Sequence, residues 1–114
     1  MKKVMKGLLL QAYGILAAAS MEKLDVAQRI EVVKILRAVR PQVEEIEGFL
    51  NDLREKNQGL TADKLAELNR LTNEEMKAEV EIDASLGDDM LNRLMEGNGT
   101  WNAAQVMLLE DVFR

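Results

Sequence analysis

The amino-acid sequence predicts a mainly α-helical fold: a helical hairpin or bundle with one short β-strand near residues 79–86 and two short C-terminal helices. Over most of the chain, apolar residues recur every three or four positions, which is the period of an amphipathic helix. Residues 79–86 instead alternate polar and apolar, so that Val80 and Ile82 share one face of a half-buried strand. A length of 114 residues, with 47% hydrophobic residues and one proline, fits a single helical domain over residues 1–114.

The N-terminal segment is predicted to form a core helix. Three lysines, Lys2, Lys3 and Lys6, precede an apolar stretch over residues 7–19. This order, followed by small residues over 17–20, also resembles an export signal, which stays open as an alternative. The apolar stretch is shorter than the roughly 20 residues that cross a bilayer, so we expect no membrane contact.

Two glycines in this segment, Gly7 and Gly14, are predicted to be contact points. They are seven residues apart and so lie nearly on one face of a helix. Because glycine has no side chain, another backbone can approach closely at these positions. We therefore name them as interaction residues, together with Val80, Ile82 and Trp101.

The second element is predicted to be a long amphipathic helix that begins after a capping pair, Asp25 and Gln28. Its apolar residues follow at steps of three or four, and they are Ile30, Val33, Leu36, Val39, Val43, Ile46, Leu50 and Leu53. Such a seam suits packing along a neighbouring helix or along a copy of itself. Pro41 lies inside the run and removes one backbone hydrogen bond. Because the seam keeps its phase through the proline, we expect a kink rather than a break.

A third helix is predicted to complete the hairpin. Gly59 suits the left-handed backbone of a turn. Thr61 is expected to cap the helix, with Leu60 and Leu65 packing around that cap as a hydrophobic staple.

The C-terminal part is predicted to hold two short helices. The first opens at Asp88 or Asp89 and runs through Met95. The second follows a glycine-rich turn and is expected to be capped by Thr100 and to carry Trp101.

The predicted strand has no second alternating run in the sequence with which to pair. A single strand leaves the N–H and C=O groups along its edges unsatisfied. We therefore expect the strand to pair with a copy of itself or with a partner, or to be covered by a helix.

The composition excludes several classes of enzyme. The chain contains neither cysteine nor histidine, so thiol nucleophiles, Cys/His zinc sites and serine hydrolase triads with a histidine base are ruled out. Carboxylates with a divalent ion remain. All-helical nucleoside triphosphate pyrophosphatases hold magnesium with a Glu-x-x-Glu pair on one helix and a Glu-x-x-Asp pair on the next. Glu44 and Glu47 match the first pair, whereas Glu79 and Asp83 are four apart and do not match the second. This enzyme is our alternative function, and no other catalytic, cofactor-binding or metal-binding residue is predicted.

The net charge of −5 is unevenly distributed. Residues 1–57 hold ten basic and eight acidic groups, whereas residues 58–114 hold five and twelve. An acidic chain without a cluster of basic and aromatic residues is a poor candidate for binding nucleic acid, because affinity for nucleic acid rests on neutralising phosphates. Lys34, Arg37 and Arg40 form a local basic stripe at helical spacing, which we interpret as a solvated helix face.

The order of elements in the second half of the chain resembles a known family. A long helical pair is followed by Glu-Val-Glu-Ile-Asp over 79–83, by Asp-Met-Leu-Asn-Arg-Leu over 89–94 and by Val-Met-Leu-Leu-Glu over 106–110. From about Ile30 onward the chain is similar to an uncharacterised family of small proteins encoded in phages and prophages of bacteria. The resemblance brings no catalytic residues. It implies a phage gene product that works beside virion or assembly proteins in the bacterial cytoplasm.

Taken together, the sequence predicts a non-enzymatic interaction or assembly protein that acts through helical contacts with other proteins. The sequence contains two apolar helix seams, a helix with glycines seven residues apart on one face, and an unpaired strand. Together these features offer more self-complementary surface than one small chain is expected to cover. Two-fold dimers are the commonest oligomers, so we expect a homodimer.

Overall fold

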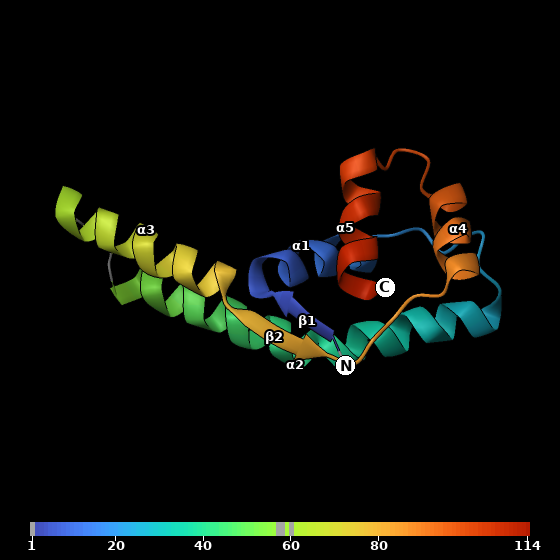
Figure 1. Cartoon of the computed structure of the whole chain (residues 1–114), viewed down its shortest axis with the longest axis horizontal. Coiled ribbons are helices and arrows are strands. Elements are labelled where there is room, and N and C mark those ends of the chain that lie inside the picture. Colours follow the sequence, from blue (N-terminus) through green and yellow to red (C-terminus); the bar gives the residue numbers. More distant parts are fainter. Residues whose placement is uncertain (1, 57–58, 60) are drawn as a thin grey trace.

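A computed structural model of the chain describes residues 2–56, 59 and 61–114. These residues form five helices and a two-stranded antiparallel sheet, which confirms the predicted mainly helical fold (Figure 1). In chain order the elements are β1 (Lys2–Met5), α1 (Lys6–Ala17), α2 (Val26–Lys56), α3 (Ala62–Lys77), β2 (Glu79–Ile82), α4 (Asp88–Gly97) and α5 (Ala103–Phe113).

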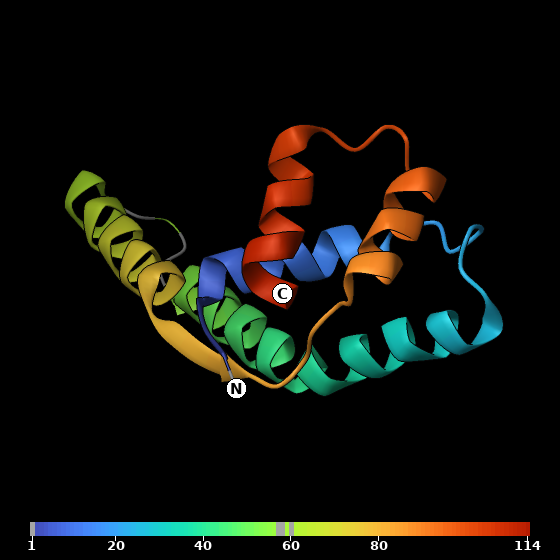
Figure 2. The same cartoon turned by 45° about the vertical axis from the view of Figure 1, so that its right-hand side comes forward.

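The molecule is elongated and is built along α2. Its radius of gyration is 16.3 Å, against about 13 Å for a compact domain of this length. The principal extents are 52 × 28 × 19 Å. α3 runs back along one end of α2, whereas α1, α4 and α5 gather over the other part of the molecule (Figure 1 and Figure 2). A body only 19 Å thick leaves many helix faces with no neighbour on one side.

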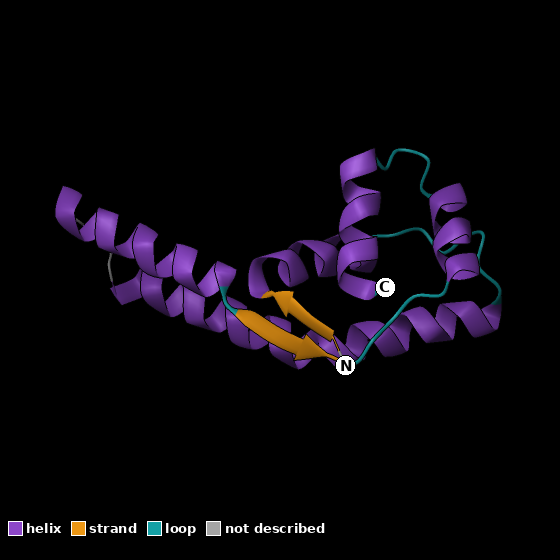
Figure 3. Cartoon of the chain, in the orientation of Figure 1, coloured by secondary structure: helices purple, strands orange, loops and turns teal. Residues whose placement is uncertain are grey.

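The predicted strand pairs within the chain, which corrects the expectation that no partner strand exists. β2 pairs antiparallel with β1, placing Val4 opposite Val80 and Lys2 opposite Ile82 (Figure 3). The Gln42 side chain of α2 donates a hydrogen bond of 2.6 Å to the Glu81 carbonyl, which ties β2 to the long helix. The sequence Lys-Lys-Val-Met of β1 is too short and too basic to show alternation, so only the tertiary structure reveals this strand.

The start of α2 is capped as predicted. The backbone N–H of Gln28 donates to the Asp25 carboxylate at 2.8 Å, and that of Asp25 donates to the Gln28 side chain at 3.2 Å. α2 then continues through Pro41 to Lys56, so the proline does not end the helix.

The buried face of α2 differs from the predicted seam over its first turns. The buried residues of α2 are Val32, Ile35, Val39, Val43, Ile46 and Leu50. Ile30 is 50% exposed and Val33 is only half-buried, so the prediction of buried residues was wrong at these positions. It was correct from Val39 to Leu50. The reason is geometric. Nine residues at about 100° each separate Ile30 from Val39, so the two point to opposite sides of the helix.

The caps of the later helices are partly as predicted. The Thr61 side chain accepts a hydrogen bond from the Lys64 backbone N–H, and Gly59 has a left-handed φ of 71°, which confirms both predictions. Leu60 lies outside the described residues. Thr100 was the wrong cap for the last helix, because Asn102 and Gln105 form a reciprocal capping box at 2.9 Å in each direction.

Both C-terminal helices are present. α4 begins at Asp88, as expected, and ends at Gly97, two residues beyond the predicted Met95. α5 begins at Ala103, so Trp101 precedes the helix instead of lying in it.

α3 has little of its surface buried. No residue of this helix falls in the buried core, and Leu65 is 50% exposed. At its C-terminal end, the Glu75 carboxylate lies 2.7 Å from the Lys6 ammonium group. A side chain added to Gly7 would come within 3.1 Å of the Met76 carbonyl oxygen. α1 and α3 are therefore in close contact at this point.

The core is continuous from the sheet to the C-terminal helix. Its fully buried large side chains are Phe113, Leu9, Leu16, Ile82, Leu94, Leu109, Val32, Val39 and Val112. The Leu86 backbone N–H donates to the Phe113 carbonyl, which fixes the end of α5 to the segment after β2.

The glycines at positions 7 and 48 are predicted to respond oppositely to alanine. Gly48 lies in α2 with no heavy atom within 4 Å of an added Cβ, so Gly48→Ala should raise the free energy of unfolding by about 1 kcal/mol through helix propensity. Gly7→Ala should lower it by about 1–3 kcal/mol, because the added methyl group meets the Met76 backbone. Urea denaturation measures both, and a gain in stability for Gly7→Ala would contradict the close contact.

The two phenylalanines provide a second comparison. Phe113 is fully buried, so Phe113→Ala should cost about 3–5 kcal/mol through lost burial and the cavity left behind. Phe49 is 44% exposed, so the same substitution there should cost much less. Equal shifts in the urea midpoint would show that the C-terminal helix does not close the core.

Candidate functional site

The carboxylates named for the alternative enzyme do not converge. Glu44, Glu47, Glu79 and Asp83 are all exposed, and the Glu44 carboxylate lies 3.3 Å from the Arg40 guanidinium group. Within the described ranges, no group of three or more Asp or Glu residues is placed to hold a metal ion. A hard cation such as Mg²⁺ needs several oxygens from different directions, and these four residues do not provide them.

The one strong electrostatic cluster on α3 is a surface feature. Hydrogen bonds from Arg70 lower the pKa of Glu67, and Arg70 also donates to Glu74 at 2.6 Å. All three side chains are exposed and lie three or four residues apart on one helix. Such pairs stabilise an isolated helix face by a few tenths of a kcal/mol. This cluster therefore helps to stabilise the helical conformation of α3, which gains little stability from buried side chains.

A groove lies between α1 and α5 on the surface of the molecule. Its volume is about 720 Å³, and it is open to solvent. Its lining residues are Leu10, Gln11, Gly14 and Ile15 from α1 and Ala18 at its C-terminal cap, with Trp101, Asn102, Ala104, Gln105 and Leu108 from α5 and the turn before it. Two predicted interaction residues, Gly14 and Trp101, thus meet in one place although they are far apart in the sequence.

The groove exists because small residues face it. α1 turns Leu9, Ala12 and Leu16 into the core and leaves Gly14 and Ala18 on its outer side. No heavy atom lies within 4 Å of a Cβ added to Gly14, so the space above it is open.

The groove has an apolar floor and a polar edge. Leu10, Ile15 and Leu108 are half-buried beneath it, and the half-buried Trp101 lies beside them. The polar side chains of Asn102 and Gln105 are already held in the capping box at the start of α5. Gln11 is the third polar residue of the lining and lies on the exposed side of α1. The groove therefore suits an apolar helix whose edge carries a polar group that can reach Gln11.

The remaining predicted interaction residues serve the chain's own packing. Gly7 lies against Met76 of α3. Ile82 is 2% exposed, and the half-buried Val80 packs against the same core. Among the five residues named from the sequence, Gly14 and Trp101 line the α1/α5 groove, and Ile82 borders a smaller hollow of about 260 Å³ beside β2.

The sequence analysis missed a second surface on α2. Val26 is 73% exposed, Ile30 is 50% exposed and Val33 is half-buried, and all three line one shallow groove on the outer side of the helix. A test of helical angle would have found this face, since three steps of three from Ile30 to Val39 add up to about 180° and place Ile30 opposite the buried Val39.

Comparisons with known proteins give no family for the chain: no protein-family model matches it, nor does any curated protein or solved structure. No helix among the described residues is long and apolar enough to cross a membrane.

Proposed function

We propose that the protein is a small non-enzymatic interaction or assembly protein that acts through helical contacts and forms a homodimer through the α1/α5 groove. The observation that carries the proposal is the groove itself, whose lining combines the small residues Gly14 and Ala18 with apolar side chains such as Leu10, Ile15 and Leu108. Small residues four apart on one helix face let a second helix approach closely.

A second copy of the chain is the occupant that fits the groove best. In a two-fold dimer the same patch lies on both subunits, so α1 of each copy would cross the other near Gly14.

The biological setting is proposed from the sequence resemblance. The resemblance noted in the sequence from about Ile30 onward, which no matching family model accompanies, is the basis for proposing a role beside virion or assembly proteins. Such a role would place the protein in the cytoplasm of a bacterial host.

The dimer is tested by filling the groove. The wild-type chain should show a mass of twice 12.8 kDa in size-exclusion chromatography with light scattering. Gly14→Leu should shift it to the monomer, because the new side chain occupies the space that the second copy needs. Gly48→Leu is the matched control, since Gly48 is also helical with open space around it, and should leave the dimer intact.

Trp101 gives an independent signal for the same event. It is the single tryptophan and lines the groove, so its emission should move to shorter wavelength as the protein concentration rises and the dimer forms. A wild-type monomer at high concentration, or an unchanged dimer in Gly14→Leu with normal circular dichroism, would refute the proposal.

A further inference from the structure

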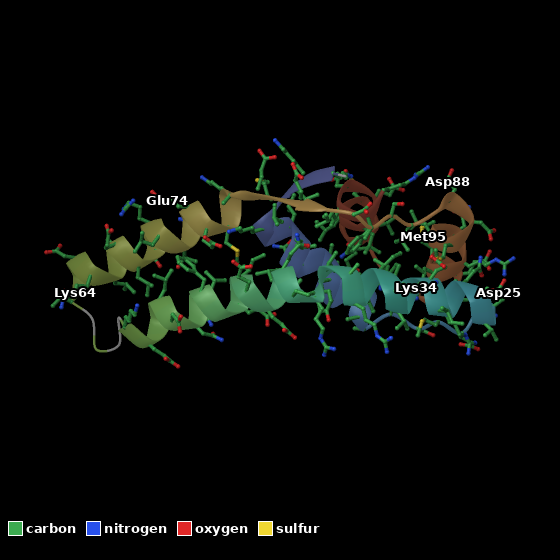
Figure 4. The ribbon with its side chains drawn as sticks, turned by 90° about the horizontal axis from the view of Figure 1, so that it is seen from below. Asp25, Lys34, Lys64, Glu74, Asp88 and Met95 are labelled. Atoms are coloured by element: carbon green, nitrogen blue, oxygen red, sulfur yellow. The ribbon has the colours of Figure 1, made fainter. Side chains whose placement is uncertain are left out.

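The first half of α2 is apolar on two sides. Val32 and Ile35 face the core, at 1% and 6% exposure. Val26, Ile30 and Val33 line a groove of about 330 Å³ on the outer side. Figure 4 draws the side chains along this part of α2 as sticks and labels Lys34 among them. Apolar residues on both sides of one helix indicate that the outer side is also used for packing.

Basic side chains surround these outer apolar residues. Arg29, Lys34 and Arg37 line the same groove as Val26, Ile30 and Val33. Residues 26–40 contain four basic groups and one acidic group, a local charge of +3 in a chain of net charge −5. The rest of the chain therefore carries −8, and this helix face stands out as basic.

Of the four basic groups, Arg40 pairs with Glu44 at 3.3 Å, and the other three are poorly neutralised by their neighbours. Arg37 makes no ion pair with any residue in the described ranges. The Arg29 guanidinium group donates to the backbone carbonyls of Met21 and Leu24, which carry no net charge. Lys34 lies 3.6 Å from the Glu31 carboxylate, but the pair is exposed and so contributes little.

We propose that this face, defined by Val26, Ile30, Val33, Lys34 and Arg37, binds an acidic amphipathic helix of a partner protein. Val26, Ile30, Val33 and Arg37 are separated by steps of four, three and four residues, so they lie along one face of α2. Residues with this spacing form the contact line between two helices packed side by side. A partner helix would place its apolar seam on the valine and isoleucine side chains and its carboxylates beside Lys34 and Arg37. The inference rests on the proposed role as an interaction protein but uses a separate surface.

Other occupants fit the face less well. An amphipathic helix that lies on a membrane usually presents large apolar residues such as Trp, Phe and Leu, whereas this face has only Val and Ile. The groove on this face has no aromatic side chain on which a nucleic-acid base could stack, and phosphates alone would leave Val26 and Ile30 uncovered. A second copy would bring the same basic face, and like charges in register oppose binding.

Charge-matched peptides test the proposal. Three labelled peptides of about three heptads share one apolar seam and carry Glu, Gln or Lys at the flanking positions. In fluorescence anisotropy the Glu peptide should bind, the Gln peptide should bind about tenfold more weakly, and the Lys peptide should not bind. Lys34→Glu with Arg37→Glu should reverse this order, and Arg54→Glu near the other end of α2 should leave it unchanged.

The position of the site is tested with the apolar residues. Ile30→Gln should abolish binding of the Glu peptide, while the oligomeric mass of the protein measured by light scattering stays the same. The Gly14→Leu variant should still bind the peptide, so failure of the dimer and failure of this site are distinguishable.

Three results would overturn the inference. They are equal binding of the Glu and Lys peptides, a change of oligomeric mass in Ile30→Gln, and binding to phosphatidylserine vesicles that Ile30→Gln removes. The second result would assign the face to self-association and the third to a membrane.

Discussion

Packing along one side of α2 is the constraint on which the rest of the structure depends. A row of six buried residues, from Val32 to Leu50, runs along this 31-residue helix. Each buried aliphatic side chain contributes about 1.5–3 kcal/mol, whereas an isolated helix has little stability of its own. The sheet is tied to this helix through Gln42, and residues of α1, α4 and α5 complete the same core cluster. Pro41 is tolerated because it lies on the exposed side, away from this row.

Both proposed contact surfaces follow from the elongated shape. The molecule is only 19 Å thick in its shortest dimension, so parts of α1 and α2 have no neighbouring helix on one side. On α1 the open side carries Gly14 and Ala18 and becomes a groove against α5. On α2 the open side carries Val26 and Ile30 beside basic residues. The two surfaces differ in charge and shape, so they suit different partners: a second copy at the neutral groove and an acidic helix at the basic face.

The sequence predicts local features well and long-range features poorly. The Asp25–Gln28 and Thr61 caps and the left-handed Gly59 depend on neighbouring residues alone, and the structure confirms them. β1 was missed because its four residues gain their conformation only by pairing with β2. The groove was also unpredictable, since Gly14 and Trp101 meet through the packing of α1 on α5. The error at Ile30 was avoidable, because steps of three drift around a helix by about 60° each.

The most direct test of this account compares two isoleucines on opposite sides of α2. Ile35 is 6% exposed in the core, and Ile30 is 50% exposed on the basic face. Urea denaturation of Ile35→Ala should show a loss of about 2–5 kcal/mol, and Ile30→Ala should lose less than about 1 kcal/mol. Equal losses would contradict the account, because they would mean that Ile30 belongs to the core and that the outer face of α2 is not available to a partner.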